Sequence, residues 1–175
     1  IGTVTATDAD SGDSITFTVS GSELTITSGG VLSFASAPDY ETKTSYAVAV
    51  TATDGATSFT QDITINITDV DDVAPVFSSS ASLSAAENQT AIGTVTATDV
   101  DSSSITFTVS GTELSITSAG VLSFASAPDY ETKASYTATV TASDGTNTTT
   151  QAITVNVTNV NDNSPVFTSS ATFSA

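Results

Sequence analysis

The sequence predicts an all-β protein that consists of two similar sandwiches in tandem. Short apolar runs alternate with polar residues at a period of two, which is typical of strands with one buried face. The same blocks of sequence occur twice at a spacing of about 90 residues, which suits a small autonomous domain better than a solenoid unit. Ser and Thr are abundant, and no stretch keeps a helical periodicity.

The internal repeat is out of phase with the ends of the chain. Residues 1–8 recur as residues 92–99, but the second copy has a leading segment, 76–91, that the first copy lacks. The tail, from Val166 to Ala175, repeats the start of that segment. We therefore expect a repeat without its first strand at 1–72, a nearly complete repeat at 73–162, and the first strand of a following repeat at 163–175.

Each complete repeat is predicted to contain seven strands. Their inward-facing residues alternate, as in Ile105, Phe107 and Val109. Seven short strands in about 90 residues favour an immunoglobulin-like Greek-key sandwich, although the Cys and Trp residues of antibody domains are absent. In the second repeat we expect the strands at 76–86, 93–98, 104–109, 113–117, 121–125, 134–143 and 147–157.

The composition argues against several classes of function. The 175 residues include 2 basic and 19 acidic side chains, and the net charge of −17 argues against binding to nucleic acid or anionic membranes. The chain has no cysteine, which excludes disulfides and thiol nucleophiles, and no histidine, the commonest general base. No apolar run is long enough to span a bilayer. Since no nucleophile–base pair is evident either, we expect no catalytic residues and no enzyme.

The acidic residues gather in loops and around the connection between the repeats. Successive loops of a sandwich alternate between its two poles, so the loop of Asp99 and Asp101 falls at the same pole as Asp144. Stacking the repeats end to end would bring the far pole of the first against this pole of the second. Eight carboxylates would then converge, those of Asp39, Glu41, Asp69, Asp71, Asp72, Asp99, Asp101 and Asp144.

Such a cluster is costly unless cations neutralise it. Calcium takes six to eight oxygen ligands, and so many protein oxygens on flexible loops suit it better than the smaller magnesium ion. The alternative is a solvated acidic surface that promotes solubility. A second acidic group falls at the opposite pole of the second repeat and contains Glu87, Asp129 and Glu131.

The motifs around these acids resemble those of tandem cadherin repeats, in the correct order and in both copies. The stretch 69–75, Asp-Val-Asp-Asp-Val-Ala-Pro, is similar to the Asp-x-Asn-Asp-Asn-x-Pro linker, and 159–165 is closer still. Residues 38–41 and 128–131, Pro-Asp-Tyr-Glu, resemble the Leu-Asp-Arg-Glu loop. Other matches are the Asp-x-Asp pairs Asp8/Asp10 and Asp99/Asp101, the Ala-x-Asp-x-Gly-like sites of Asp54 and Asp144, and the Pro-Glu-Asn-like site of Glu87.

This resemblance implies a calcium-rigidified adhesion module. It implies that Asp39, Glu41 and Asp72 hold inner ions together with the carbonyl of Val70. It also implies an outermost ion held by Asp71, Asp99, Asp101, Asp144 and the carbonyl of Val73, with Asp101 bridging. By the same motifs, further ligands are Asp69, Asp8, Asp10, Asp54, Glu87, Asp129, Glu131, Asn161 and Asp162.

The sequence departs from the cadherin pattern in three places. The first-strand Glu that would serve the internal linker would lie upstream of Ile1, so we expect the innermost ion there to bind weakly. Ala86 replaces the proline before Glu87. The chain has no Trp, so nothing supports the tryptophan-anchored strand-swap dimer.

The resemblance implies an extracellular or cell-surface location, in a membrane-anchored or secreted protein of the bacterial kind. Partners would be calcium and another protein, bound by homophilic or heterophilic adhesion. The alternative is a carbohydrate- or polysaccharide-binding module, although Tyr40 and Tyr130 are interpreted as packing residues rather than sugar platforms. The open sheet edge of the first repeat further suggests strand exchange through the tail from Val166 to Ala175.

Overall fold

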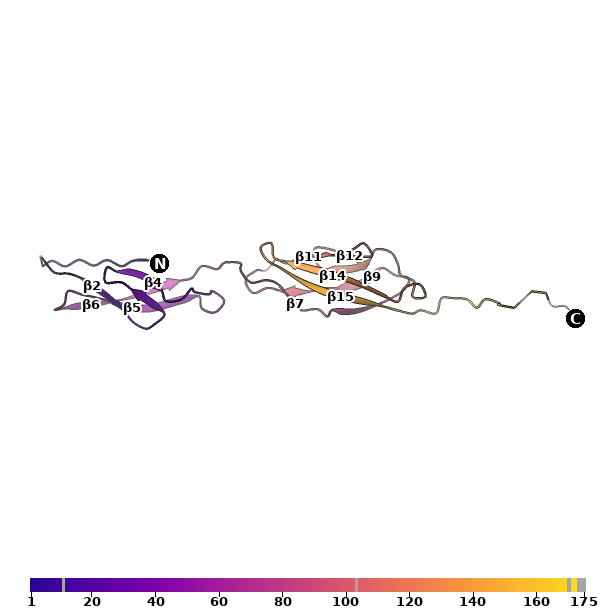
Figure 1. Ribbon diagram of the computed structural model, residues 1–175, viewed down its shortest axis with the longest axis horizontal. Helices are drawn as coiled ribbons and strands as arrows, with labels where there is room; N and C mark the ends of the chain where they lie inside the picture. The colour runs from indigo at the N-terminus through magenta and orange to yellow at the C-terminus, as the bar shows by residue number, and fades with distance from the viewer. Residues whose placement is uncertain (11, 103, 170, 173–175) are drawn as a thin grey trace. The chain divides into compact units, whose positions relative to one another are not determined.

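The computed structural model describes residues 1–10, 12–102, 104–169 and 171–172 (Figure 1). These residues form strands, turns and loops, and they contain no helix, which confirms the predicted all-β class. The chain divides into two compact units, Ile1–Val70 and Asp71–Ala175. Within the described residues there is no helix that could cross a membrane.

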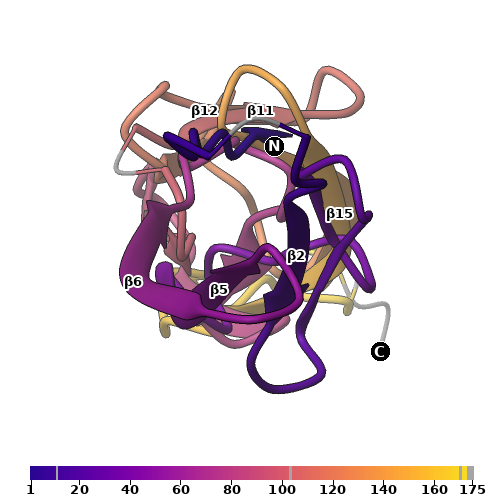
Figure 2. The same cartoon turned by 90° about the vertical axis from the view of Figure 1, so that its left-hand side faces the viewer.

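The described residues of the first unit form six strands in two antiparallel sheets. Figure 2 shows the neighbouring strands β2, β5 and β6. The first sheet has the order β1 (Gly2–Thr3), β4 (Val31–Phe34), β3 (Leu24–Ile26), and the second has the order β2 (Thr16–Val19), β5 (Ser45–Thr53), β6 (Ser58–Asn66).

The second unit has the same two sheets with additional strands. One sheet has the order β12 (Leu114–Ile116), β13 (Val121–Phe124), β9 (Ala91–Thr94). The other has the order β11 (Thr106–Val109), β14 (Ser135–Ser143), β15 (Thr148–Thr158), β8 (Ser82–Ala86). A separate pair joins β10 (Ala97–Thr98) to β7 (Val76–Phe77).

The first strand expected at 76–86 is wrong in one respect, because the structure divides it in two. Its first part, β7, pairs antiparallel with β10, and its second part, β8, pairs parallel with β15. The segment therefore serves both sides of the sandwich, and the short polar residues between the two parts carry the chain across. The strand expected at 93–98 is likewise divided, into β9 and β10.

The tail forms no strand in its described part, residues 163–169 and 171–172. The remaining positions of the predicted tail strand, 170 and 173–175, lie outside the described residues. Val166 and Phe167 are 84% and 95% exposed, respectively. The Pro-Val-Phe sequence of the tail therefore has the composition of β7 but not its pairing.

The core of the second unit lies between its two sheets. Ile153, Val155 and Val157 alternate along β15 and are buried against residues of the opposite sheet such as Leu122 and Phe124. Burial of each such side chain contributes about 1.5–3 kcal/mol relative to exposure. The period-two pattern of the sequence therefore specifies which face of each strand is buried.

The core of the first unit is smaller, although its sequence is nearly the same. Its buried apolar side chains are Leu24, Leu32, Val48 and Val50. Ile63 and Ile65 are half-buried, whereas the corresponding Ile153 and Val155 of the second unit are 2% and 0% exposed. The difference arises because β7 and β8 complete the sandwich of the second unit and have no counterpart among the described residues of the first.

Candidate metal centres

The loop that follows β10 holds the linker at the start of the second unit. One carboxylate oxygen of Asp101, Oδ2, accepts hydrogen bonds from the backbone N–H groups of Asp72 and Val73, both at 2.9 Å. Asp99 Oδ1 accepts from the N–H groups of Asp101 and Ser102 at 3.1 and 3.2 Å. The Asp-x-Asp motif therefore forms a compact turn that fixes a carboxylate against the linker.

The loop between β14 and β15 contacts the same linker segment. Asp144 Oδ1 accepts from the N–H groups of Thr146 and Asn147 at 2.7 and 2.6 Å. Asn147 Nδ2 then donates to the carbonyl oxygens of Asp71 and Val73 at 3.3 and 3.4 Å, and the Thr146 hydroxyl donates to Asp71 Oδ2 at 3.2 Å. Both loops thus lie against residues 71–73, at one pole of the unit.

Three carboxylate oxygens at this pole are buried and have no hydrogen-bond donor in the described part of the chain. They are Asp99 Oδ2, Asp101 Oδ1 and Asp144 Oδ2. Burying a carboxylate oxygen without a compensating partner costs on the order of several kcal/mol. A bound cation removes this penalty, and carboxylate oxygens are the ligands that Ca²⁺ prefers. The donor set of this pole therefore fits the calcium ion that the sequence implies.

The pKa values of the Asp-x-Asp pair move apart. The close approach of the Asp101 carboxylate, followed by burial, raises the pKa of Asp99. The same contact, together with the backbone N–H groups of Val73 and Asp72, lowers the pKa of Asp101. Two carboxylates this close repel each other when both are ionised. Asp99 receives no hydrogen bond from the linker N–H groups that stabilise ionised Asp101, so Asp99 is the one whose pKa rises.

The opposite pole of the second unit is built around a buried carboxylate. Glu87 is 3% exposed, and its two oxygens accept from the backbone N–H groups of Tyr130 and Val160, each at 2.7 Å. This residue therefore ties the loop 128–131 to the segment that follows β15. Nearby, Asn159 Nδ2 donates to Glu131 Oε1 at 3.0 Å.

Two groups of three acidic side chains have carboxylate oxygens within 4.8 Å of one another in the described residues. One contains Glu87, Asp129 and Glu131, and the other contains Asp8, Asp10 and Asp13 of the first unit. Asp99, Asp101 and Asp144 do not form such a group, although their loops share one pole.

The other predicted ligands divide between the two units. Asp39, Glu41, Asp69 and Val70 belong to the first unit, and Asp71, Asp72 and Val73 to the second. Asp54, in the first unit, accepts hydrogen bonds from Ala56 and Thr57 in the turn that follows β5. Asp162 lies beyond β15 and accepts from Asn88 Nδ2 at 2.5 Å, and Asn161 is exposed in the same segment. The convergence of both units on one ion cluster stays a prediction.

Sequence reasoning missed several residues that the structure places at these poles. Asn147 and Thr146, which hold the linker, are replaced in the first repeat by Thr57 and Ala56. That difference between two otherwise similar repeats could have marked Thr146 and Asn147 as residues with a role of their own. Asp13 was missed because no motif contains it, although it lies in the same loop as the Asp-x-Asp pair.

The comparisons with known proteins point to one domain type. No protein-family model matches the chain. Over 185 residues it is 31% identical to the mouse cadherin EGF LAG seven-pass G-type receptor 1, a match that covers 94% of this chain and 6% of the relative. The chain thus spans a small fraction of the length of its curated relatives. Those relatives come from mouse, human and fruit fly, which gives the predicted bacterial origin no support.

Solved structures give the same answer. Mouse cadherin-23 EC22-24 superimposes with a TM-score of 0.77 at 26% identity, over 93% of this chain and 60% of that chain. Protocadherin gamma B2 extracellular cadherin domains 3-6 superimpose with a TM-score of 0.72 at 28% identity, over 85% of this chain and 42% of that chain. The predicted sandwich fold is confirmed. The chain is therefore a tandem of cadherin-like repeats.

Proposed function

We propose that the chain is a non-enzymatic, calcium-binding part of an extracellular adhesion protein, in which ions at the linker stiffen the connection between its repeats. The observation that carries this proposal is the set of three buried, unpartnered carboxylate oxygens on Asp99, Asp101 and Asp144. They lie on the two loops that form hydrogen bonds with the linker. A divalent cation is the partner that best offsets the cost of burying them.

The ligands of the second unit would hold the outermost ion. Asp99, Asp101 and Asp144 supply the buried oxygens, and Asp71 and the carbonyl of Val73 lie against the same loops. The inner ions would need Asp39 and Glu41 of the first unit as well as the linker residues Asp69, Val70 and Asp72. This part of the proposal requires the poles of the two units to meet.

Stiffening follows from the charges. Asp69, Asp71 and Asp72 belong to one four-residue stretch of the linker, and like charges this close repel each other in the absence of cations. Ions shared by both units would replace this repulsion with attraction and fix the angle between the repeats. Extracellular calcium modules of this kind bind at about 10⁻⁴–10⁻³ M.

Isothermal calorimetry with calcium on the 175-residue chain tests the binding. Asp144→Asn keeps a side-chain oxygen for the N–H groups of Thr146 and Asn147 but removes a ligand charge, so we expect weaker binding or the loss of one site. Asp62→Asn is the matched control, because Asp62 is an exposed residue on β6 that lies outside the predicted sites. Absence of calcium heat in the unsubstituted chain, or equal losses in the two variants, would contradict the proposal.

Small-angle X-ray scattering tests the stiffening. Calcium should lengthen the chain's maximum dimension and narrow its distribution of shapes, and a chelator should reverse both changes. The Asp144→Asn variant should need more calcium for the same change, whereas Asp62→Asn should follow the unsubstituted chain. A scattering curve that calcium leaves unchanged would leave the acidic loops as a solvated surface.

The far pole of the second unit would be the half-site for a following repeat. Glu87, Asp129 and Glu131 already meet within 4.8 Å, and Asp162 and Asn161 follow in the next linker. In this reading the same calcium chemistry recurs at each connection. Adhesion itself, homophilic or heterophilic, would then depend on surfaces that the stiffened repeats present.

The polysaccharide-binding alternative has less support. Sugar platforms need exposed aromatic side chains on one surface. In the described residues the aromatic side chains classed as exposed are Phe59, Tyr130 and Phe167, which lie in three separate segments. A glycan array on the unsubstituted chain tests this alternative, and specific binding that resists a chelator would favour it over adhesion.

A further inference from the structure

Both units contain the same turn after a long strand, after β5 in the first unit and after β14 in the second. In each turn an aspartate, Asp54 or Asp144, accepts hydrogen bonds at Oδ1 from the backbone N–H groups two and three residues later, at 2.7 and 2.6 Å. In each turn the N–H group of the aspartate also donates to the carbonyl oxygen three residues later, at 3.4 Å. The backbone hydrogen bonds therefore agree, and the two turns differ in their side chains.

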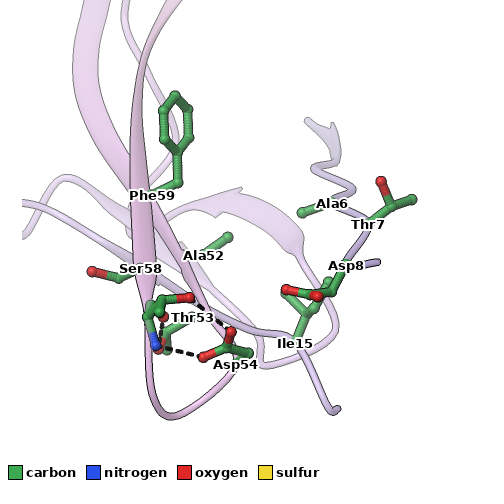
Figure 3. A pocket seen from close by; sticks show the side chains of 10 residues that line it. Ala6, Thr7, Asp8, Ile15, Ala52, Thr53, Asp54, Ser58 and Phe59 are labelled. Carbon is green, nitrogen blue, oxygen red and sulfur yellow. Dashed lines mark hydrogen bonds between the residues drawn. The ribbon is translucent and has the colours of Figure 1, made fainter. Parts of the chain in front are cut away.

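The side chain three residues after the aspartate makes the difference. In the first unit the hydroxyl of Thr57 donates to Asp54 Oδ2 at 2.8 Å, and the hydrogen bonds of this turn are the dashed lines at Asp54 in Figure 3. In the second unit the same position holds Asn147. Asp144 Oδ2 is buried there, and no hydrogen-bond donor reaches it from the part of the chain that the structure describes. One residue therefore decides whether the second carboxylate oxygen has a donor.

Two other turns repeat the threonine arrangement. Asp39 accepts from the N–H group of Thr42 at Oδ1 and from its hydroxyl at Oδ2, at 3.1 and 2.9 Å. Asp129 accepts from Thr132 in the same way, at 3.3 and 2.9 Å. A threonine hydroxyl is attached to Cβ and therefore bonds readily to groups of its own turn. The amide group of an asparagine lies one atom further from the backbone, so Asn147 can reach another segment instead.

The segment that Asn147 reaches is the linker. Its Nδ2 faces the carbonyl oxygens of Asp71 and Val73 at 3.3 and 3.4 Å, and Asp71 Oδ1 at 3.3 Å. The NH₂ group has two hydrogens for these three oxygens, and the distances exceed the usual value of about 2.9–3.0 Å, so the donors are shared. A carbonyl oxygen has two lone pairs, and it can accept from the amide while it binds a cation. The amide can therefore stay in place when an ion enters.

We propose that Asn147 is a positioning residue of the calcium site in the second unit. Its amide group orients the oxygens of Asp71 and Val73, and because this amide bonds to the linker, Asp144 Oδ2 stays free to bind the ion. The inference rests on the calcium-binding function proposed above. Hydrogen bonds from outer-shell groups to metal ligands contribute about 10–100-fold to metal affinity. A threonine in place of Asn147 would remove the linker donors and supply a hydroxyl donor to Asp144 Oδ2.

The variants Asn147→Thr and Asn147→Val separate these two contributions. Both lose the linker donors and have similar shapes, but only threonine has the hydroxyl that reaches the aspartate of its own turn. Thr57 shows that this turn forms with a β-branched residue at the position, so both variants should fold. Calcium titration of the 175-residue chain is followed through the backbone amide signals of Val73 and Gly145, which report this site. Asn147→Thr should weaken calcium binding at least about tenfold, and Asn147→Val should fall between it and the unsubstituted chain.

Side-chain amide signals provide a readout that a purely structural role would not change. The NH₂ signals of Asn147, identified by their loss in both variants, should shift when calcium is added, because the oxygens that they face become ligands. Asn156 is the comparison, since its Nδ2 donates to Ser82 Oγ at 3.4 Å on the sheet, and its signals should stay in place. If the Val73 signal shifts with calcium while the Asn147 signals do not, the amide is not a partner of the ligands and the proposal is overturned.

Thr57→Val is the matched control for the affinities, because it changes the corresponding turn of the first unit and removes the hydroxyl from Asp54. It should leave the calcium titration at Val73 and Gly145 unchanged. Unaltered calcium affinity in both Asn147 variants would overturn the proposal, and equal losses would overturn the role given to Asp144 Oδ2. An unsubstituted chain that binds no calcium would refute the calcium-binding function as well. The failure of this inference alone can therefore be told from the failure of the proposed function.

Discussion

Gly120→Ala should destabilise the second unit far more than a change at another glycine with a similar backbone conformation. Gly120 has a φ of +86° in the turn before β13, a region that costs an L-residue about 1–2 kcal/mol. An added Cβ would overlap the carbonyl oxygen of Val95 and lie 3.3 Å from Cδ2 of Phe107. The turn cannot retreat freely, because Val95 N–H donates to Gly120 O at 2.9 Å.

The size of the effect follows from the backbone strain at Gly120 and from its contacts with Val95 and Phe107. Displacing the Val95 hydrogen bond costs about 1 kcal/mol, and moving the Phe107 ring in a packed core costs at least about 1 kcal/mol more. With the backbone strain, we expect Gly120→Ala to lower the free energy of unfolding by about 3–4 kcal/mol. For a domain of about 100 residues this is a fall of at least about 12 °C in Tm.

Gly111→Ala is the matched control for this change. Gly111 has a φ of +80°, and an added Cβ there would meet no atom within 4 Å. We therefore expect the strain alone, about 1–2 kcal/mol. Thermal unfolding followed through resolved amide signals of the second unit measures both variants, since the two units need not unfold together. Equal losses of stability would refute the reasoning, because they would show that the turn relaxes away from Val95.

Three further predictions concern the acidic residues and calcium. Glu87→Gln should lower the free energy of unfolding by about 2 kcal/mol, because the amide NH₂ of the new glutamine would face a backbone N–H donor in a buried site. Urea unfolding measures this loss. The exposed Glu113→Gln is the control and should change the stability little. Hydrogen bonds from Thr57 and Ala56 lower the pKa of Asp54 to about 2 from its ordinary value of 3.8, so its contribution to stability is complete above pH 3.8 and is lost as the pH falls through 2. An NMR titration of the Asp54 carboxyl in calcium-free solution checks this value, which Thr57→Val should raise; a midpoint near 3.8 in the unsubstituted chain would contradict the assignment. Adding a chelator to the calcium-loaded chain should lower its unfolding temperature in calorimetry. Excess magnesium should restore that temperature only in part, because magnesium demands a stricter ligand geometry than calcium. Full restoration by magnesium would argue against sites with calcium geometry.

Much of the candidate site could be predicted from the sequence because its motifs are local. Asp99 and Asp101 form a turn with their own neighbours, and Asp144 does the same with Thr146 and Asn147. Their shared pole follows from the alternation of loops in a sandwich. The contacts of Asn147 with the linker could not be predicted, because they join residues more than 70 positions apart in the chain and depend on how the two loops pack.

The sequence by itself determined the all-β class, the two repeats and the faces of the strands, because period two and internal repetition are properties of the order of residues. Only the tertiary structure decided that residues 76–86 divide between two pairing partners, because a one-dimensional pattern does not show where a strand leaves one sheet. It also decided how deeply corresponding residues of the two repeats are buried. Ile153 is buried and Ile63 half-buried because β7 and β8 cover only the second unit in the described residues. Burial depends on what lies across the sheet, and two similar stretches of sequence can therefore end in different environments.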